Sequence, residues 1–169
     1  MTTGNDGDDQ ARGFDFLHGA WSVRHRKRRH RLVGDECWLE FGGTMTARRI
    51  LAGAGNIDEN VLDDPAGAYR ACTLRLFDPA SGTWSIFWID GRNPRPDPPV
   101  TGAFHGGQGR FLGEDVLGGR PILVRFLWSR RDRPSPRWEQ AFSADGGSRW
   151  ETNWIMDFDR VAGREGELE

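Results

Sequence analysis

Short segments rich in aromatic and β-branched residues recur along the whole chain, and glycines and prolines separate them. This feature most constrains the fold, because segments of this length and composition form β-strands, whereas no stretch keeps a helical period over about a dozen residues. We expect about ten strands, at residues 20–33, 36–50, 56–62, 69–77, 83–90, 99–105, 110–117, 120–129, 136–143 and 150–158. A proline-rich stretch at 90–100 is expected to be a stiff connection outside the sheet.

So many antiparallel strands in one chain of 169 residues must avoid exposed sheet edges. Closure into an up-and-down barrel is the simplest solution, and a β-sandwich is the alternative. We therefore predict an all-β fold, a single antiparallel up-and-down β-barrel of about ten strands over residues 13–160, with a short helical turn at 13–19. The polar, acidic ends, residues 1–12 and 161–169, are expected to be disordered.

Large aromatic side chains occupy every second position of several predicted strands. A period of two places such residues on one face of the sheet. The sets are Trp84, Ile86 and Trp88; Val124, Phe126 and Trp128; Trp138, Gln140 and Phe142; and Trp150, Thr152, Trp154 and Met156. Each ring can simply fill a core, but small solid barrels mostly use aliphatic residues, so rings beside a polar Gln140 favour a lined cavity.

Residues 24–31, RHRKRRHR, are all basic or histidine. On a strand this run divides between two faces. Arg24, Arg26, Arg28 and His30 point one way, and His25, Lys27, Arg29 and Arg31 point the other. The favoured interpretation is a solvent-exposed strand extension paired with nearby acidic residues. Contact with an anionic ligand or a partner is an alternative, and nucleic-acid binding is disfavoured because the net charge is −2.

Catalytic and metal-binding motifs are absent from the sequence: there is no G-x-S-x-G, no P-loop and no tight histidine pair. We predict no metal and no cofactor. Three carboxylates on predicted strands, Glu59, Asp90 and Glu139, are the candidates for acid–base chemistry. Arg75 lies between two leucines and is expected to pair inside the barrel with Glu59 or Asp90, because an isolated buried charge is costly.

Several segments carry a family resemblance, among them FDFLHGAWSV, GNIDE, LRLFDP, WSIFW, DPPVTGAF and RWEQAFSADGGSRWETNWIM. The first resembles the opening of calycin-superfamily barrels, with Gly19 and Trp21 in the G-x-W positions. Together they resemble, over about residues 14–160, a bacterial family of lipocalin-like β-barrel proteins with no assigned reaction. The resemblance implies the barrel fold and, from wider calycin relatives, small hydrophobic ligands. It does not imply haem, because the histidine that binds haem in the nitrobindin branch lies on a late strand and this chain has none after His105.

The favoured function is binding of a small hydrophobic or aromatic molecule in the barrel interior. The predicted ligand-binding residues are Arg75, Trp88, Trp128, Trp138, Gln140 and Trp154. One alternative is a metal-independent acid–base enzyme of the isomerase, cyclase or decarboxylase type that uses the same cavity. Another is a ligand-free barrel that is structural or forms a homodimer. We expect no nucleic-acid or membrane partner, and a cytoplasmic protein, because no signal peptide or long apolar run is present.

Overall fold

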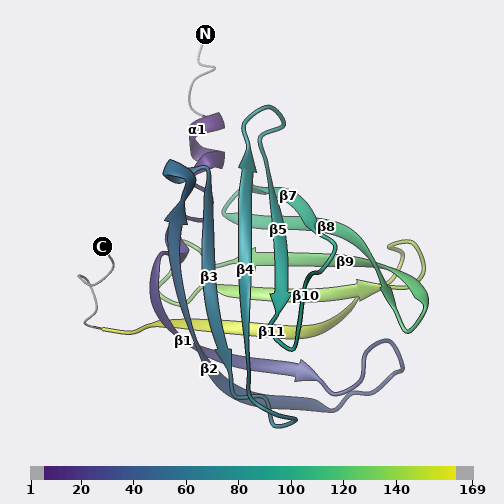
Figure 1. The fold of residues 1–169 in the computed structure, drawn as a ribbon. Helices are drawn as coiled ribbons and strands as arrows, with labels where there is room; N and C mark the ends of the chain where they lie inside the picture. Colours follow the sequence, from purple (N-terminus) through teal and green to yellow (C-terminus); the bar gives the residue numbers. More distant parts are fainter. Residues whose placement is uncertain (1–5, 163–169) are drawn as a thin grey trace.

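A computed structural model describes residues 6–162. It contains a short helix and a 3-10 turn, followed by strands almost to the end of the described chain (Figure 1). The elements are α1 (Asp6–Ala11), η1 (Asp15–Leu17), β1 (Gly19–Arg28), β2 (Trp38–Ile50), η2 (Leu51–Gly53), β3 (Gly55–Leu62), β4 (Tyr69–Asp78), β5 (Thr83–Asp90), β6 (Asn93–Pro96), β7 (Val100–His105), β8 (Gln108–Leu117), β9 (Arg120–Ser129), β10 (Arg137–Ser143) and β11 (Glu151–Arg160).

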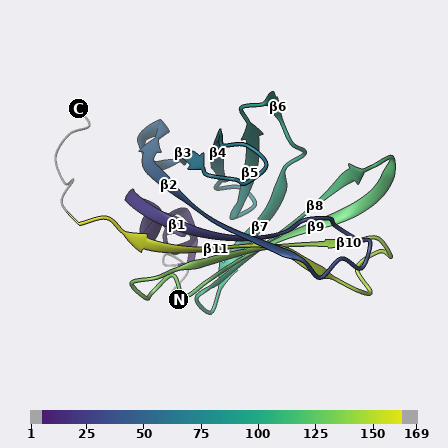
Figure 2. The same cartoon turned by 90° about the horizontal axis from the view of Figure 1, so that it is seen from below.

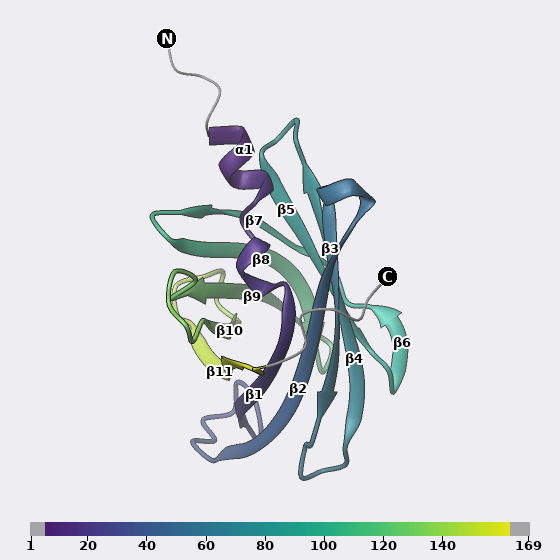
Figure 3. The ribbon, with the colours of Figure 1, turned by 90° about the vertical axis from the view of Figure 1, so that its left-hand side faces the viewer.

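The strands form one closed antiparallel barrel. Strands β1 to β5 pair in chain order, and so do β7 to β11. The ring closes where β11 pairs with β1 and where β5 pairs with β7. Only β5 pairs with β6, so ten of the eleven strands make the ring, which Figure 3 shows from the side of the N-terminal segment. The predicted fold, an up-and-down barrel of about ten strands with a helical turn before β1, is confirmed.

Two differences from the predicted strands affect the site. The proline-rich stretch is not wholly outside the sheet, since β6 pairs with the end of β5 at an edge (Figure 2). An edge strand tolerates proline because half of its N–H groups face away from the sheet. Strand β1 ends at Arg28 and not at residue 33, and residues 29–37 form a loop instead.

Residues 6–11 form helix α1, within the segment 1–12 for which the composition predicts disorder. Helix α1 lies within that segment, and Gln10 connects it to the barrel. The Gln10 side chain donates to the Phe104 carbonyl at 2.6 Å and accepts from the Phe104 N–H at 3.1 Å. The Gln10 carbonyl accepts from Trp84 Nε1 at 2.7 Å. Residues 1–5, and 163–169 of the predicted tail, lie outside the described residues.

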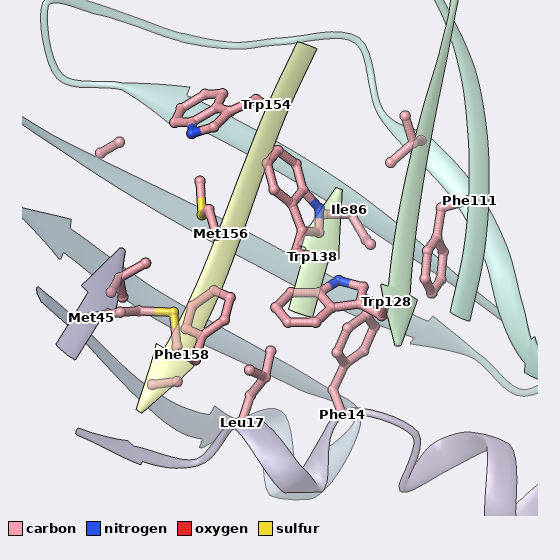
Figure 4. Packing of buried hydrophobic residues seen from close by; sticks show 14 of the residues in the cluster. Phe14, Leu17, Met45, Ile86, Phe111, Trp128, Trp138, Trp154, Met156 and Phe158 are labelled. Carbon is pink, nitrogen blue, oxygen red and sulfur yellow. The ribbon is translucent and has the colours of Figure 1, made fainter. Parts of the chain in front are cut away.

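One end of the barrel is closed by η1 and the residue before it. Phe14 and Leu17 are buried among the barrel's rings, with Trp128 next to them and Trp138 and Trp154 further along the interior (Figure 4). Trp21 Nε1 donates to the Leu17 carbonyl at 2.7 Å, and the Arg160 guanidinium lies 4.2 Å from the centroid of the Trp21 ring. This end therefore has no room for a ligand.

A bulge in β11 changes which residues face inward. Gln140 pairs with Trp154, but its neighbour Ala141 pairs with Thr152, so Asn153 is the extra residue. The predicted single face from Trp150 to Met156 is therefore wrong. Trp154 and Met156 are buried in the interior core, whereas Trp150 lies outside, with the Arg125 guanidinium 4.5 Å from the centroid of its ring.

We predict that Gly19→Ala lowers the free energy of unfolding by about 2–3 kcal/mol. Gly19 has a φ of 110°, which is accessible essentially only to glycine, and an added Cβ would lie 2.9 Å from Arg160 Nη1. Urea unfolding measures the loss. The control is Gly118→Ala, at a φ of 57° with open space around it, which should cost only about 1–2 kcal/mol. Equal losses in the two variants would contradict a special role for Gly19 in closing the barrel.

Candidate functional site

The barrel contains two spaces, one behind the other. The larger, called here the outer cavity, has a volume of about 260 Å³ and lies at the end opposite η1. It reaches the barrel mouth, where Asp97 and Val116 are exposed. The smaller, called here the inner chamber, has a volume of only about 30 Å³ and lies deeper, toward η1. Ile86, Trp88, Phe126 and Trp138 line both spaces, so they separate the two.

Tryptophan rings set at right angles form the wall of the outer cavity. Trp154 lies with its ring centroid 5.6 Å from that of Trp138 and 5.6 Å from that of Trp88, at interplanar angles of 83° and 81°. This edge-to-face arrangement is favourable between rings. Gln140 also lines the cavity and donates to Asn153 Oδ1 at 2.8 Å. Four of the predicted ligand-binding residues, Trp88, Trp138, Gln140 and Trp154, thus meet around one space.

The other two predicted ligand-binding residues, Arg75 and Trp128, line the inner chamber instead. A chamber of about 30 Å³ is the size of one water molecule, so it cannot hold an organic ligand. A molecule in the outer cavity is separated from Arg75 by Trp88 and Trp138. Arg75 therefore does not contact a ligand in the outer cavity, and its partner is a side chain of the barrel itself.

Arg75 forms a buried ion pair with Asp58, not with Glu59 or Asp90 as the sequence suggested. Arg75 Nη1 lies 2.6 Å from Asp58 Oδ2, and the two side chains are only 4% and 1% exposed. Arg75 Nη1 also donates to Asn56 Oδ1 at 2.9 Å. The alternation of β3 turns Asp58 inward and Glu59 outward, which explains the different partner.

The three predicted acid–base residues do not meet in the cavity. Glu59 is exposed on the outer surface, where it accepts from Arg70 at 2.9 Å. Glu139 lies on the face of β10 opposite Trp138 and Gln140. Asp90 lines the outer cavity, but its hydrogen bonds from Arg92 hold the pKa of this carboxyl below its usual range. Only Asp90 of the three therefore lines the cavity, and its carboxylate is paired with Arg92.

The basic run is not simply a solvent-exposed extension of β1. Arg24 and Arg26 are exposed on the outer face, as that interpretation requires. Three of the alternate residues point into the barrel, where His25 is 2% exposed and Lys27 and Arg31 line the outer cavity, whereas Arg29 is exposed in the loop after β1. The period of two predicted this division. It could not show which face is interior, because that depends on how the sheet closes.

His25 is buried as a neutral ring beneath the cavity wall. Its Nδ1 accepts from Trp154 Nε1 at 3.2 Å, and its ring stacks on Phe41 with centroids 4.7 Å apart. Burial, assisted by the nearby Lys27 charge, lowers the pKa of His25 to about 4. The acceptor bond orients the Trp154 ring, one of the three indoles that line the cavity. The sequence shows only that His25 lies on the same face of its strand as Lys27, and nothing else in it marks His25 for this role.

Comparison with solved structures shows the fold of the barrel. The S-type phycobiliprotein lyase CPES from Guillardia theta superposes with a TM-score of 0.61 over 97% of this chain and 99% of that chain, at 8% sequence identity. No protein-family model matches the chain, and no curated protein sequence is significantly similar to it. The calycin-like fold is thus confirmed, and the bacterial family named from the sequence remains a prediction.

Neither a metal-binding cluster nor a membrane-spanning helix occurs within residues 6–162. No group of three or more His, Cys, Asp or Glu side chains is arranged there to hold a metal ion. No helix in the same part of the chain is long and apolar enough to cross a membrane.

We predict that His25 makes stability fall on acidification. Its folded pKa of about 4 lies below the unfolded value of 6.5, so the unfolded state binds more protons between these limits. The free energy of unfolding should then fall by about 3 kcal/mol as the pH drops from about 6.5 to about 4. Urea unfolding across this range should show that His25→Gln removes this loss, while the matched variant His30→Gln, at an exposed ring, retains it. Parallel pH curves for wild type and His25→Gln would contradict the assignment.

We predict that the Asp58–Arg75 pair is strongly coupled. Asp58→Asn leaves the Arg75 charge buried without its counterion and should cost about 3–5 kcal/mol. The double variant Asp58→Asn/Arg75→Met removes both charges and should be less destabilised than the sum of the two single variants. Chemical denaturation of all four proteins measures this coupling, and additive losses would show that the two charges do not depend on each other.

Proposed function

We propose that this protein binds a small hydrophobic or aromatic molecule in the outer cavity. The observation that carries the proposal is the cavity itself, with about 260 Å³ of space, an opening at the barrel mouth and walls of aromatic side chains. Ligand pockets are concave and combine apolar walls with polar groups that fix the orientation of the ligand. The outer cavity has aromatic walls and a large share of charged and amide side chains, and its volume lies just below the usual range. A molecule of one to three rings matches that volume.

Binding energy would come mainly from apolar burial against the rings of Trp88, Trp138 and Trp154. Each Å² of apolar surface removed from water contributes about 25 cal/mol. Gln140 would orient the ligand, because its amide has hydrogen-bonding capacity beyond the single bond to Asn153. The enzyme alternative has weaker support, since Glu59 and Glu139 lie outside the cavity and Asp90 is paired with Arg92.

The fold supports the proposal in a general way. A barrel of the same topology serves as a phycobiliprotein lyase in Guillardia theta. The calycin resemblance of the sequence implies small hydrophobic ligands for barrels of this kind. Membership of the bacterial lipocalin-like family remains part of the proposal, carried by the segments quoted above.

We predict that filling the outer cavity abolishes binding. Ile122 lines the cavity and Leu123 lies on the opposite face of β9, so Ile122→Trp and Leu123→Trp add the same bulk inside and outside. The neutral fluorescent probe N-phenyl-1-naphthylamine should bind saturably to wild type and to Leu123→Trp, but not to Ile122→Trp. Circular dichroism checks that each variant is folded. Absence of binding to wild type, or equal binding to both variants, would refute a ligand site in this cavity.

A further inference from the structure

The outer cavity holds three cationic side chains, and two of them are already neutralised. Lys27 Nζ lies 3.4 Å from Asp64 Oδ2. Arg92 Nη2 lies 2.7 Å from Asp90 Oδ2, and its guanidinium stacks 3.5 Å from the centroid of the Tyr69 ring. Within residues 6–162, Arg31 forms no ion pair with a carboxylate, although the charges of Glu151, Asp97 and Asp64 act on it from farther away. Arg31 is therefore the cation of the cavity that can accept a counterion.

Arg31 is held among aromatic rings rather than in solvent. Its guanidinium carbon lies 5.4 Å from the centroid of Phe142 and 5.9 Å from that of Trp154. Burial lowers the pKa of Arg31, the direction expected for a charge that has lost part of its hydration. An anion bound there would restore the lost stabilisation of that charge.

The backbone after Arg31 holds it in this position. Leu32 has a φ of 59°, an uncommon conformation for a branched residue, and its N–H donates to Glu151 Oε1 at 2.9 Å. The Leu32 side chain packs against the barrel core. The loop after β1 is thus tied to β11, which holds Arg31 toward the cavity before any ligand binds. Such preorganisation lowers the entropic cost of binding.

We propose that the ligand of the outer cavity is an organic monoanion, an aromatic carboxylic acid, whose carboxylate binds the Arg31 guanidinium while its ring lies against Trp154 and Phe142. This inference rests on the proposed function. It adds that the ligand carries a negative charge and that the Arg31 guanidinium binds this charge. Guanidinium and carboxylate match in geometry and form paired, charge-assisted hydrogen bonds.

Carboxylates at the mouth limit the ligand to one negative charge. Asp97 is exposed and Asp115 is half-buried at the rim. Each of these carboxylates repels an anionic group that remains at the barrel mouth. The loss of part of its hydration, and then the charges of Asp115 and Asp90, raise the pKa of Asp97, while the Arg31 charge acts in the opposite direction. A second anionic group would face them, whereas a single carboxylate can pass inward to Arg31.

The test compares two probes of nearly equal shape, 2-naphthoate and the neutral 2-naphthamide, by isothermal titration calorimetry. Wild type should bind the acid at least about tenfold more tightly than the amide, the size of one charge-assisted contact. Arg31→Gln should lower the affinity for the acid about tenfold and leave that for the amide unchanged. Arg31→Lys, which keeps the charge but not the planar fork, should lie between them. The matched control is Arg26→Gln, an identical change on the outer face of β1, which should leave both affinities unchanged.

The possible results separate this inference from the proposed function. Equal binding of acid and amide to wild type would overturn the anion while leaving an aromatic-binding cavity. An equal loss of acid binding in Arg26→Gln and Arg31→Gln would overturn Arg31 as the anchor, because the effect would then come from overall charge. Failure of both probes to bind, together with no binding of N-phenyl-1-naphthylamine, would refute the cavity as a binding site altogether.

Discussion

Closure of one barrel end by the N-terminal segment is the constraint on which the rest of the structure depends. Trp21 bonds to the Leu17 carbonyl, and Arg160 covers the Trp21 ring while donating to the His18 and Phe16 carbonyls at 2.8 and 3.0 Å. These contacts join the first and last strands of the ring to η1. Because the rings around Phe14 then fill that end, space for a ligand remains only at the opposite mouth.

Polar groups inside the barrel are stabilised in three different ways. Asp58 and Arg75 neutralise each other and are hydrogen-bonded by their neighbours, as buried charges require. His25 avoids charge, since its lowered pKa keeps the ring neutral and able to accept from Trp154. Arg31 keeps its charge without a direct ion pair in the described chain, with Glu151, Asp97 and Asp64 acting on it only from a distance, and that difference distinguishes the outer cavity from an ordinary packed core.

Two local irregularities decide the shape of the cavity. The bulge at Asn153 returns Trp154 to the interior while Trp150 stays outside, so the cavity wall has one ring fewer than strict alternation would give. The early end of β1 lets the loop at 29–37 turn back toward β11, where Glu151 holds Leu32. A regular strand from Trp150 to Met156 would have placed Trp150 in the barrel.

The sequence by itself determined the strands, the barrel and most of the cavity wall, because strand formation and the period of two depend on neighbouring residues. Trp88, Trp138, Gln140 and Trp154 could be grouped for that reason. Only the tertiary structure decided which carboxylate pairs with Arg75, since Asp58 and Glu59 are adjacent and only closure of the sheet defines an inside. It also decided that Arg31 faces the cavity, because that depends on a backbone bend and a bond to Glu151, far away in the chain. Contacts of this range are set by the folded barrel and leave no local pattern in the sequence.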